Sequence, residues 1–179
     1  MIFHSRSRTK TVYFVYSGEV MLYNLTKHGN RKVIFILGKG QLLNQSIVSK
    51  KPNALFCEAV CPVKVIEIAE EQFLQLMEQS HALTRAVLRE YERNLWRMGH
   101  QLKNTTGNMQ MERKIAAKLW KLGRDFGVDT EDGVMIDIDL TITLMADLVG
   151  APRENVSRAC KVLTDRGLIC YGNKRFILI

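Results

Sequence analysis

The stretch LTITLMADLVGAPRENVSRACKVLTDRGLI, residues 140–169, decides the fold of the second half of this chain. Its first part carries apolar residues at helical spacing: Met145, Ala146, Leu148 and Val149. Gly150 follows them, and glycine commonly ends a helix because it tolerates a positive φ. A second helical pattern begins near Arg153. The stretch therefore predicts two helices joined by a tight turn.

The second of these helices is predicted to have two chemically different faces. Its apolar residues follow an i, i+3, i+4, i+7 pattern: Val156, Ala159, Cys160 and Leu163. At about 100° per residue, polar residues gather on the opposite face: Arg153, Glu154, Ser157 and Arg158. Arginine donates two parallel hydrogen bonds to guanine, and glutamate accepts one from cytosine. The pattern fits a recognition helix in the major groove of DNA, whereas the charges alone would fit an ordinary solvated face.

The whole arrangement resembles the helix-turn-helix of the cyclic-AMP receptor protein/FNR (Crp/Fnr) family of bacterial transcription regulators. Its residues at the family's signature spacing are Thr141, Ala146, Gly150, Arg153–Glu154, Val156–Arg158 and Arg166–Ile169. Pro152 departs from the family, which often has a capping residue there, so a helix start shifted by one residue stays open. The resemblance implies an effector-controlled regulator that binds an inverted-repeat operator. Its half-site would contain guanine and be of the TGTGA or TTGAT kind.

Length, charge and cysteine content narrow the class of protein. A chain of 179 residues allows one domain or two small ones, and 46% of hydrophobic residues is normal for a globular protein. The chain has no run of 18 apolar residues, its start is unlike a secretory signal, and its four cysteines form no disulfide framework. We therefore expect a cytoplasmic protein. The net charge is +8, and residues 153–175 carry six Lys or Arg against two acidic residues, which suits a DNA-binding surface.

Short strands dominate the first part of the chain. The predicted strands are residues 12–16, 20–23, 33–37, 55–60 and 63–68, and glycines mark several of the turns. A series of short strands without intervening helices predicts a barrel or sandwich. The turn YFVYSGEV, residues 13–20, resembles the middle of the family's effector-binding jelly roll. We expect an effector barrel over residues 1–80 that is short at its N-terminus, where family members carry a helix and further strands. Whether that short start is native or a truncation stays open.

A long helical pattern follows from residue 70 to residue 102, and residues 81–104 form the expected dimerisation helix. Its seam residues recur at +3, +4, +3 and +4: Leu88, Tyr91, Leu95, Met98 and Leu102. This heptad pattern predicts a two-stranded coiled coil, which matches the family's dimer helix. Packing of the same residues onto the chain's own barrel is the alternative.

The polar segment Lys103–Asn108 interrupts the heptads and predicts a hinge, so a winged helix-turn-helix domain is expected over residues 105–179. That domain begins with a helix that ends at Gly127 and a strand over residues 134–138. A final hairpin with the basic turn Gly172–Arg175 forms the wing. The further DNA contacts expected are Lys161, Lys174 and Arg175. The predicted fold class is α+β: an N-terminal jelly-roll (cupin-like) effector barrel, a long dimerisation helix and a C-terminal winged helix-turn-helix.

Catalytic and metal-binding patterns do not stand out, so we expect neither an enzyme nor a metalloprotein. The histidines are scattered away from any recognisable nucleophile: His4, His28, His81 and His100. Cys57 and Cys61 lie at a spacing that zinc sites rarely use, which favours buried free thiols. The iron–sulfur branch of the family uses an N-terminal cysteine cluster that this sequence lacks. No cofactor is therefore expected.

The family's cyclic-nucleotide cassette is also missing. That cassette pairs a Gly-Glu-Leu with an Arg-Ser or Arg-Thr, because Glu binds the ribose hydroxyl and Arg neutralises the cyclic phosphate. The matching segments, Leu43–Ser46 and Pro52–Phe56, contain neither the Glu nor the Arg, although Lys50 and Lys51 offer charges for an anion. The effector stays unidentified. Organic ligands such as haloaromatic acids, which some family members sense, are compatible with an apolar barrel.

The resemblance also implies the partners of the chain: double-stranded DNA, a second copy of the chain, a small-molecule effector and RNA polymerase, with no membrane partner. A sensor barrel whose winged helix docks onto another protein is the alternative function. Salt-sensitive DNA binding would separate the two functions, because phosphate contacts release counterions.

Overall fold

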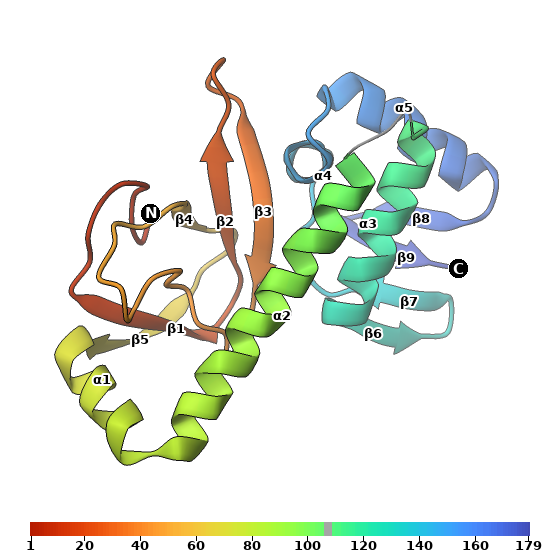
Figure 1. Cartoon of the computed structure of the whole chain (residues 1–179). Helices are drawn as coiled ribbons and strands as arrows, with labels where there is room; N and C mark the ends of the chain where they lie inside the picture. The colour runs from red at the N-terminus through yellow and green to blue at the C-terminus, as the bar shows by residue number, and fades with distance from the viewer. Residues whose placement is uncertain (106–108) are drawn as a thin grey trace. The chain divides into compact units, whose positions relative to one another are not determined.

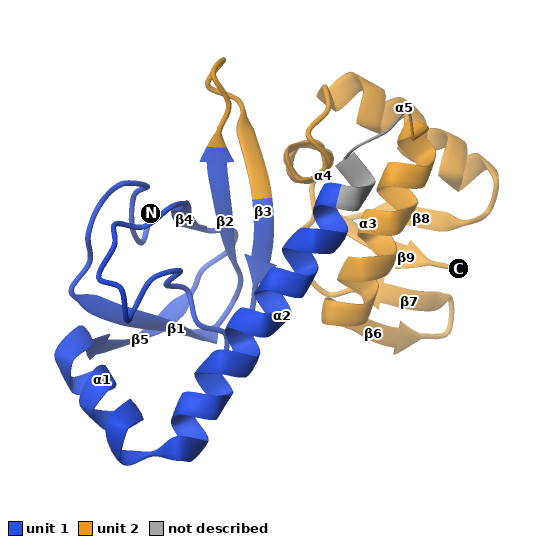
Figure 2. Ribbon diagram, viewed as in Figure 1, with its two compact units in different colours: residues 1–24, 34–105 blue, residues 25–33, 106–179 orange. Residues whose placement is uncertain are grey.

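The computed structural model describes the backbone of residues 1–105 and 109–179, and side chains outside residues 103–108. The chain divides into two compact units, coloured blue and orange in Figure 2. Unit 1 comprises Met1–Asn24 and Ile34–Thr105, and unit 2 comprises Leu25–Val33 and Thr106–Ile179. The sequence assigned residues 25–33 to the barrel and treated residues 81–104 as a separate part, so the structure groups both segments differently.

Unit 1 is built from short antiparallel strands, as predicted for the jelly roll (Figure 1). The strands are β1 (Thr11–Ser17), β2 (Val20–Leu25), β3 (Arg31–Leu37), β4 (Phe56–Ala59) and β5 (Lys64–Ala69). One sheet pairs β1 with β5, and the other has the order β3-β2-β4. An isolated bridge between Phe3 and Cys57 adds the start of the chain to β4.

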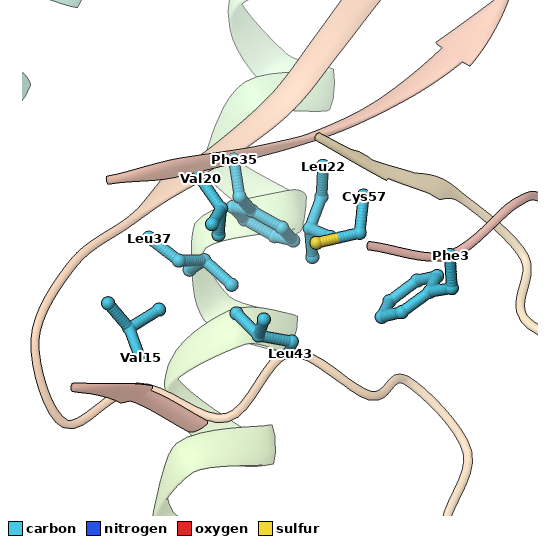
Figure 3. Packing of buried hydrophobic residues seen from close by; sticks show 8 residues of the cluster. All are labelled: Phe3, Val15, Val20, Leu22, Phe35, Leu37, Leu43 and Cys57. Atoms are coloured by element: carbon cyan, nitrogen blue, oxygen red, sulfur yellow. The ribbon is translucent and has the colours of Figure 1, made fainter. Parts of the chain in front are cut away.

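Alternating apolar residues of these strands form the core of unit 1. Figure 3 shows the buried side chains of this cluster pointing into a shared interior: Phe3, Val15, Val20, Leu22, Phe35, Leu37, Leu43 and Cys57. Each is at most 5% exposed. Burying one such large apolar side chain contributes about 1.5–3 kcal/mol, so the pairing of the two sheets is driven by this interior.

Two helices complete unit 1: α1 (Glu70–Gln79) and α2 (His81–Thr105). The sequence predicted a helical region from residue 70 to residue 102 with a dimerisation helix over residues 81–104, and the structure divides this region at Ser80. Ser80 is extended (φ −129°, ψ 98°), and its hydroxyl accepts a hydrogen bond from the Leu83 N–H at 3.2 Å. Serine is a good N-cap, so it starts α2 in a new direction instead of continuing α1. Part of the predicted hinge, residues 106–108, lies outside the described residues.

Unit 2 contains the C-terminal helices and a four-stranded antiparallel sheet. Its elements are α3 (Met111–Phe126), β6 (Gly127–Thr130), β7 (Gly133–Ile136), α4 (Ile142–Val149), α5 (Arg153–Asp165), β8 (Ile169–Gly172) and β9 (Arg175–Leu178). The sheet order is β6-β7-β9-β8. The sequence predicted that this strand extends to Ile138, but β7 ends at Ile136. Strand β6 was not predicted, because all its residues are exposed and give no apolar alternation.

The core of unit 2 joins the three helices to the sheet. Its fully buried residues include Ile115 and Leu119 of α3, Met145 of α4, Val156 of α5 and Phe176 of β9. Among the described residues, no helix is long and apolar enough to cross a membrane.

Candidate DNA-binding interface

Helix α4 and the turn after it are fixed by local hydrogen bonds at both ends. The Thr141 hydroxyl caps the start of α4 by accepting from the Leu144 N–H at 3.0 Å. Gly150 adopts the left-handed conformation (φ 71°, ψ 48°), and its N–H donates to the Ala146 carbonyl at 2.8 Å. The predicted tight turn at Gly150 is therefore confirmed.

Helix α5 starts at Arg153, with Pro152 in the N-cap position and no side-chain cap. Proline fixes a φ close to the helical value, so it starts a helix well although it supplies no hydroxyl. The Asn155 and Val156 N–H groups donate to the Pro152 carbonyl at 3.1 and 3.2 Å. Glu154 lies in the first turn, where a negative charge complements the helix dipole.

The predicted division of α5 into two faces is present in the structure. The apolar stripe is buried: Val156, Ala159, Cys160 and Leu163. The predicted polar face is exposed: Arg153, Glu154, Ser157 and Arg158. Lys161, expected as a further DNA contact, is exposed as well. Burial raises the pKa of the Cys160 thiol to about 11, so this cysteine is a protonated packing residue at neutral pH.

Arg158 is held by its own helix. One guanidinium nitrogen donates to the Asn155 side-chain oxygen, one turn earlier, at 2.5 Å. This contact restricts the rotamers of a long side chain. Asn155 was not singled out from the sequence, although its i, i+3 spacing to Arg158 was visible.

The wing is a tight hairpin between β8 and β9. Asn173 and Lys174 both have positive φ, 49° and 59°, as a two-residue hairpin turn requires. The Lys174 carbonyl accepts from the N–H of Leu140 at 2.8 Å, which ties the turn to the residue before the α4 cap. The Lys174 side chain is exposed, so its charge is available to a phosphate.

Arg175, the second basic residue predicted at the wing, is engaged within the protein. Its guanidinium lies 2.5 Å from the Asp137 carboxylate and 3.6 Å from the Asp139 carboxylate. Arg175 is half-buried, whereas Lys174 is exposed. The two aspartates were visible as alternating residues after β7, but nothing local in the sequence pairs them with a residue so far along the chain. The sequence predicted a DNA contact for both Lys174 and Arg175, whereas the structure places Arg175 in an ion pair and leaves Lys174 exposed.

The predicted dimer seam runs along α2, where four of its five residues are exposed: Leu88 (53%), Leu95 (71%), Met98 (46%) and Leu102 (66%). The fifth residue, Tyr91, packs against the chain's own core, and its hydroxyl donates to the Asn44 carbonyl at 3.4 Å. Burial raises the pKa of Tyr91 to about 12. Tyr91 therefore packs within its own chain, as the alternative to the coiled coil expects, and the other four residues are exposed in the single chain.

The segments that align with the cyclic-nucleotide cassette hold amides that bond within the chain. The Asn44 side-chain oxygen accepts from the Tyr13 N–H at 2.8 Å, and its nitrogen donates to the Thr11 carbonyl at 2.9 Å. Gln45 bridges the Leu43 carbonyl and the Leu55 N–H. These contacts brace the two segments against each other and against β1.

Within the described residues no group of three or more His, Cys, Asp or Glu side chains could hold a metal ion. None of the four cysteines, all within the described residues, forms a disulfide. Cys57 is buried with its pKa raised to about 12, chiefly by desolvation, and Cys61 donates to the Glu19 carboxylate at 3.0 Å.

A jelly-roll barrel followed by a winged helix-turn-helix defines a DNA-binding transcription regulator. Family comparisons agree with this class: a cyclic nucleotide-binding domain matches residues 1–80, and a Crp-like helix-turn-helix domain matches residues 113–179. The chain belongs to the Crp/Fnr family of transcription regulators, which are not enzymes.

Relatives and solved structures span nearly the whole chain. The global nitrogen regulator of Nostoc sp. (strain PCC 7120) is 25% identical over 177 residues, which cover 97% of this chain and 79% of the relative. The cAMP-activated global transcriptional regulator CRP of Haemophilus influenzae is 25% identical over 182 residues, covering 99% and 79%. The structure of FixK2 from Bradyrhizobium japonicum matches with a TM-score of 0.84 at 20% identity, over 99% of this chain and 86% of that one. This last likeness shows a shared fold.

Proposed function

We propose that this regulator binds an inverted-repeat operator as a homodimer and reads guanines through α5. The observation that carries the proposal is the exposed polar face of α5, opposite a fully packed apolar stripe. Arg153 and Arg158 supply bidentate donors for guanine, and Glu154 supplies an acceptor for cytosine. Ser157 and Lys161 lie on the same exposed side and add contacts to bases and phosphates. Lys174 of the wing adds a phosphate contact that carries no sequence information.

The exposed leucines and methionine of α2 support a second copy of the chain as the partner. Four large apolar side chains at heptad spacing on one helix face are costly to leave in water. A parallel pairing of two α2 helices buries Leu88, Leu95 and Leu102 against their own counterparts. A dimer with a two-fold axis presents two copies of α5 about one DNA turn apart, roughly 34 Å, which matches an inverted repeat.

The effector is proposed to be a small molecule other than cyclic AMP or cyclic GMP. The family match over residues 1–80 supports an effector site, and the relative from Haemophilus influenzae is cAMP-activated by its name. In this chain the segment Pro52–Phe56 lacks the arginine that a cyclic phosphate requires, and the Gln45 side-chain oxygen accepts from the Leu55 N–H. An unpaired phosphate is costly to bury, so a neutral or differently charged organic ligand suits the apolar interior better.

RNA polymerase is the further partner proposed for the DNA-bound dimer, because the relatives of this chain are named as global transcription regulators. Whether the chain activates or represses depends on where its operator lies relative to the promoter.

Selection of bound sequences from a random DNA pool tests the proposed function. The expected result is an inverted repeat with guanine in each half-site and an affinity that falls steeply with salt. Binding of protein partners without salt-sensitive DNA binding would instead support the docking-module alternative.

A further inference from the structure

We infer that the tip of the β2–β3 hairpin is a positioning element of the helix-turn-helix, in which Arg31 and Lys32 hold the C-terminal end of α4. The inference rests on the proposed function, because the helix being positioned precedes the recognition helix. Residues 25–33 of this tip are part of unit 2, and Figure 2 colours them with the helix-turn-helix.

The first observation is a hydrogen bond to a carbonyl that its own helix cannot satisfy. Helix α4 ends at Val149, so the Leu148 carbonyl lies in its last turn, where no later N–H of the helix can reach it. The Lys32 ammonium donates to the Leu148 carbonyl at 3.1 Å. A cation at the C-terminal end of a helix also complements the helix dipole. The Leu148 carbonyl is one of the last four of α4, which have no partner within the helix, and Lys32 supplies a donor to it from the hairpin.

A second contact joins the same two elements. Arg31 Nε lies 3.5 Å from the Asp147 carboxylate, one residue before Leu148. Burial lowers the pKa of Lys32, as does the nearby charge of Lys114, and burial raises the pKa of Asp147 against the opposing effect of Arg31. Lys32 of the hairpin and Asp147 of α4 are therefore both partly withdrawn from water, unlike ordinary surface charges.

Gly150 makes room for this contact. A Cβ at Gly150 would lie 2.7 Å from Lys32 Nζ and 3.2 Å from its Cδ. Its φ of 71° already favours glycine, so the turn between α4 and α5 has both a backbone and a packing reason for this residue. The lysine thus lies against the turn that sets the direction of α5.

The strands that carry the tip continue into the core of unit 1. Val20 and Leu22 of β2, with Phe35 and Leu37 of β3, are buried there, while Arg31 and Lys32 of the same hairpin contact α4.

Lys32→Met tests the inference against a matched control, Lys27→Met, which removes an exposed lysine from the same tip. Hydrogen–deuterium exchange of the DNA-free protein is expected to accelerate in peptides covering residues 25–33 and 142–153 of Lys32→Met only. Equal exchange in the two variants overturns the inference. Because this measurement uses no DNA, it separates failure of the inference from failure of the proposed function.

Affinity for the selected operator provides the second measurement. Lys32→Met is expected to weaken operator binding about fivefold to tenfold, through loss of one charged hydrogen bond, with the slope of affinity against salt unchanged. Lys27→Met is expected to bind as wild type. A slope reduced by about one in Lys32→Met would mean that this lysine touches a DNA phosphate, and it would overturn the positioning role. Failure of wild type itself to bind any DNA would count against the proposed function alone.

Discussion

The guanidinium of Arg175 lies 2.5 Å from the carboxylate of Asp137, and this ion pair joins strand β9 to the segment that leads into α4. Asp139 approaches the same guanidinium at 3.6 Å. Two carboxylates facing one arginine leave no net positive charge at this position. Together with the Leu140–Lys174 backbone bond, the pair holds the wing against the start of the helix-turn-helix. The exposed cation of the turn is therefore Lys174.

Lys174→Ala is expected to weaken binding to the operator and to random DNA by the same factor, because a phosphate contact is blind to sequence. The slope of affinity against salt should fall by about one. Titration of both DNAs at several salt concentrations provides the measurement. Arg175→Ala is the matched comparison, and its slope should change less, since its charge is already balanced by Asp137. A larger change for Arg175→Ala would reverse the roles assigned to these two residues.

Leu95→Asp is expected to convert the dimer to monomers. Leu95 is 71% exposed within one chain, so the substitution leaves the fold of the monomer undisturbed. In the proposed seam it would bury an unpaired charge, which costs several kcal/mol or more. Sedimentation velocity measures the outcome. Arg89→Asp, at an exposed position of the same helix outside the seam, should remain dimeric. A dimeric Leu95→Asp protein would place the interface elsewhere.

Calorimetric titration with cyclic AMP and cyclic GMP is expected to show no saturable binding in the micromolar range. The physical reason is the missing arginine between Pro52 and Phe56, without which a buried cyclic phosphate has no countercharge there. If one nucleotide does bind, the same titration of a Lys50→Ala, Lys51→Ala double variant asks whether these lysines replace the arginine. Micromolar binding by wild type would contradict the proposed effector class in either case.

Periodicity predicted the helix-turn-helix well, because α5 buries a regular stripe and exposes a regular polar face. Gly150 was recognisable for a similar local reason, since the conformation that ends α4 favours glycine over other residues. The start of the dimerisation helix at residue 81 agrees with α2, and the Ser80 hydroxyl that caps it was visible as a good helix cap. Strand β6 was missed because both its faces are exposed and it carries no alternation.

Long-range pairing explains the remaining differences between sequence and structure. The heptad pattern could not tell Tyr91, which packs on its own core, from Leu95, which does not, because both fit one helical period. The partners of Arg175 and Lys32 are set by the tertiary fold. A local pattern reports that a residue is basic, but it does not report which carboxylate or carbonyl faces it.

The direct test of the account is the affinity of wild type and Arg158→Ala for the selected operator and for random DNA. Arg158 is exposed on α5 and held by Asn155, so its loss should remove one bidentate contact to guanine. The account predicts that discrimination between the two DNAs falls by about 1–3 kcal/mol, with random DNA bound nearly as before. An equal loss of affinity on every sequence would show that Arg158 contacts only the DNA backbone, and it would contradict the assignment of α5 as the helix that reads bases.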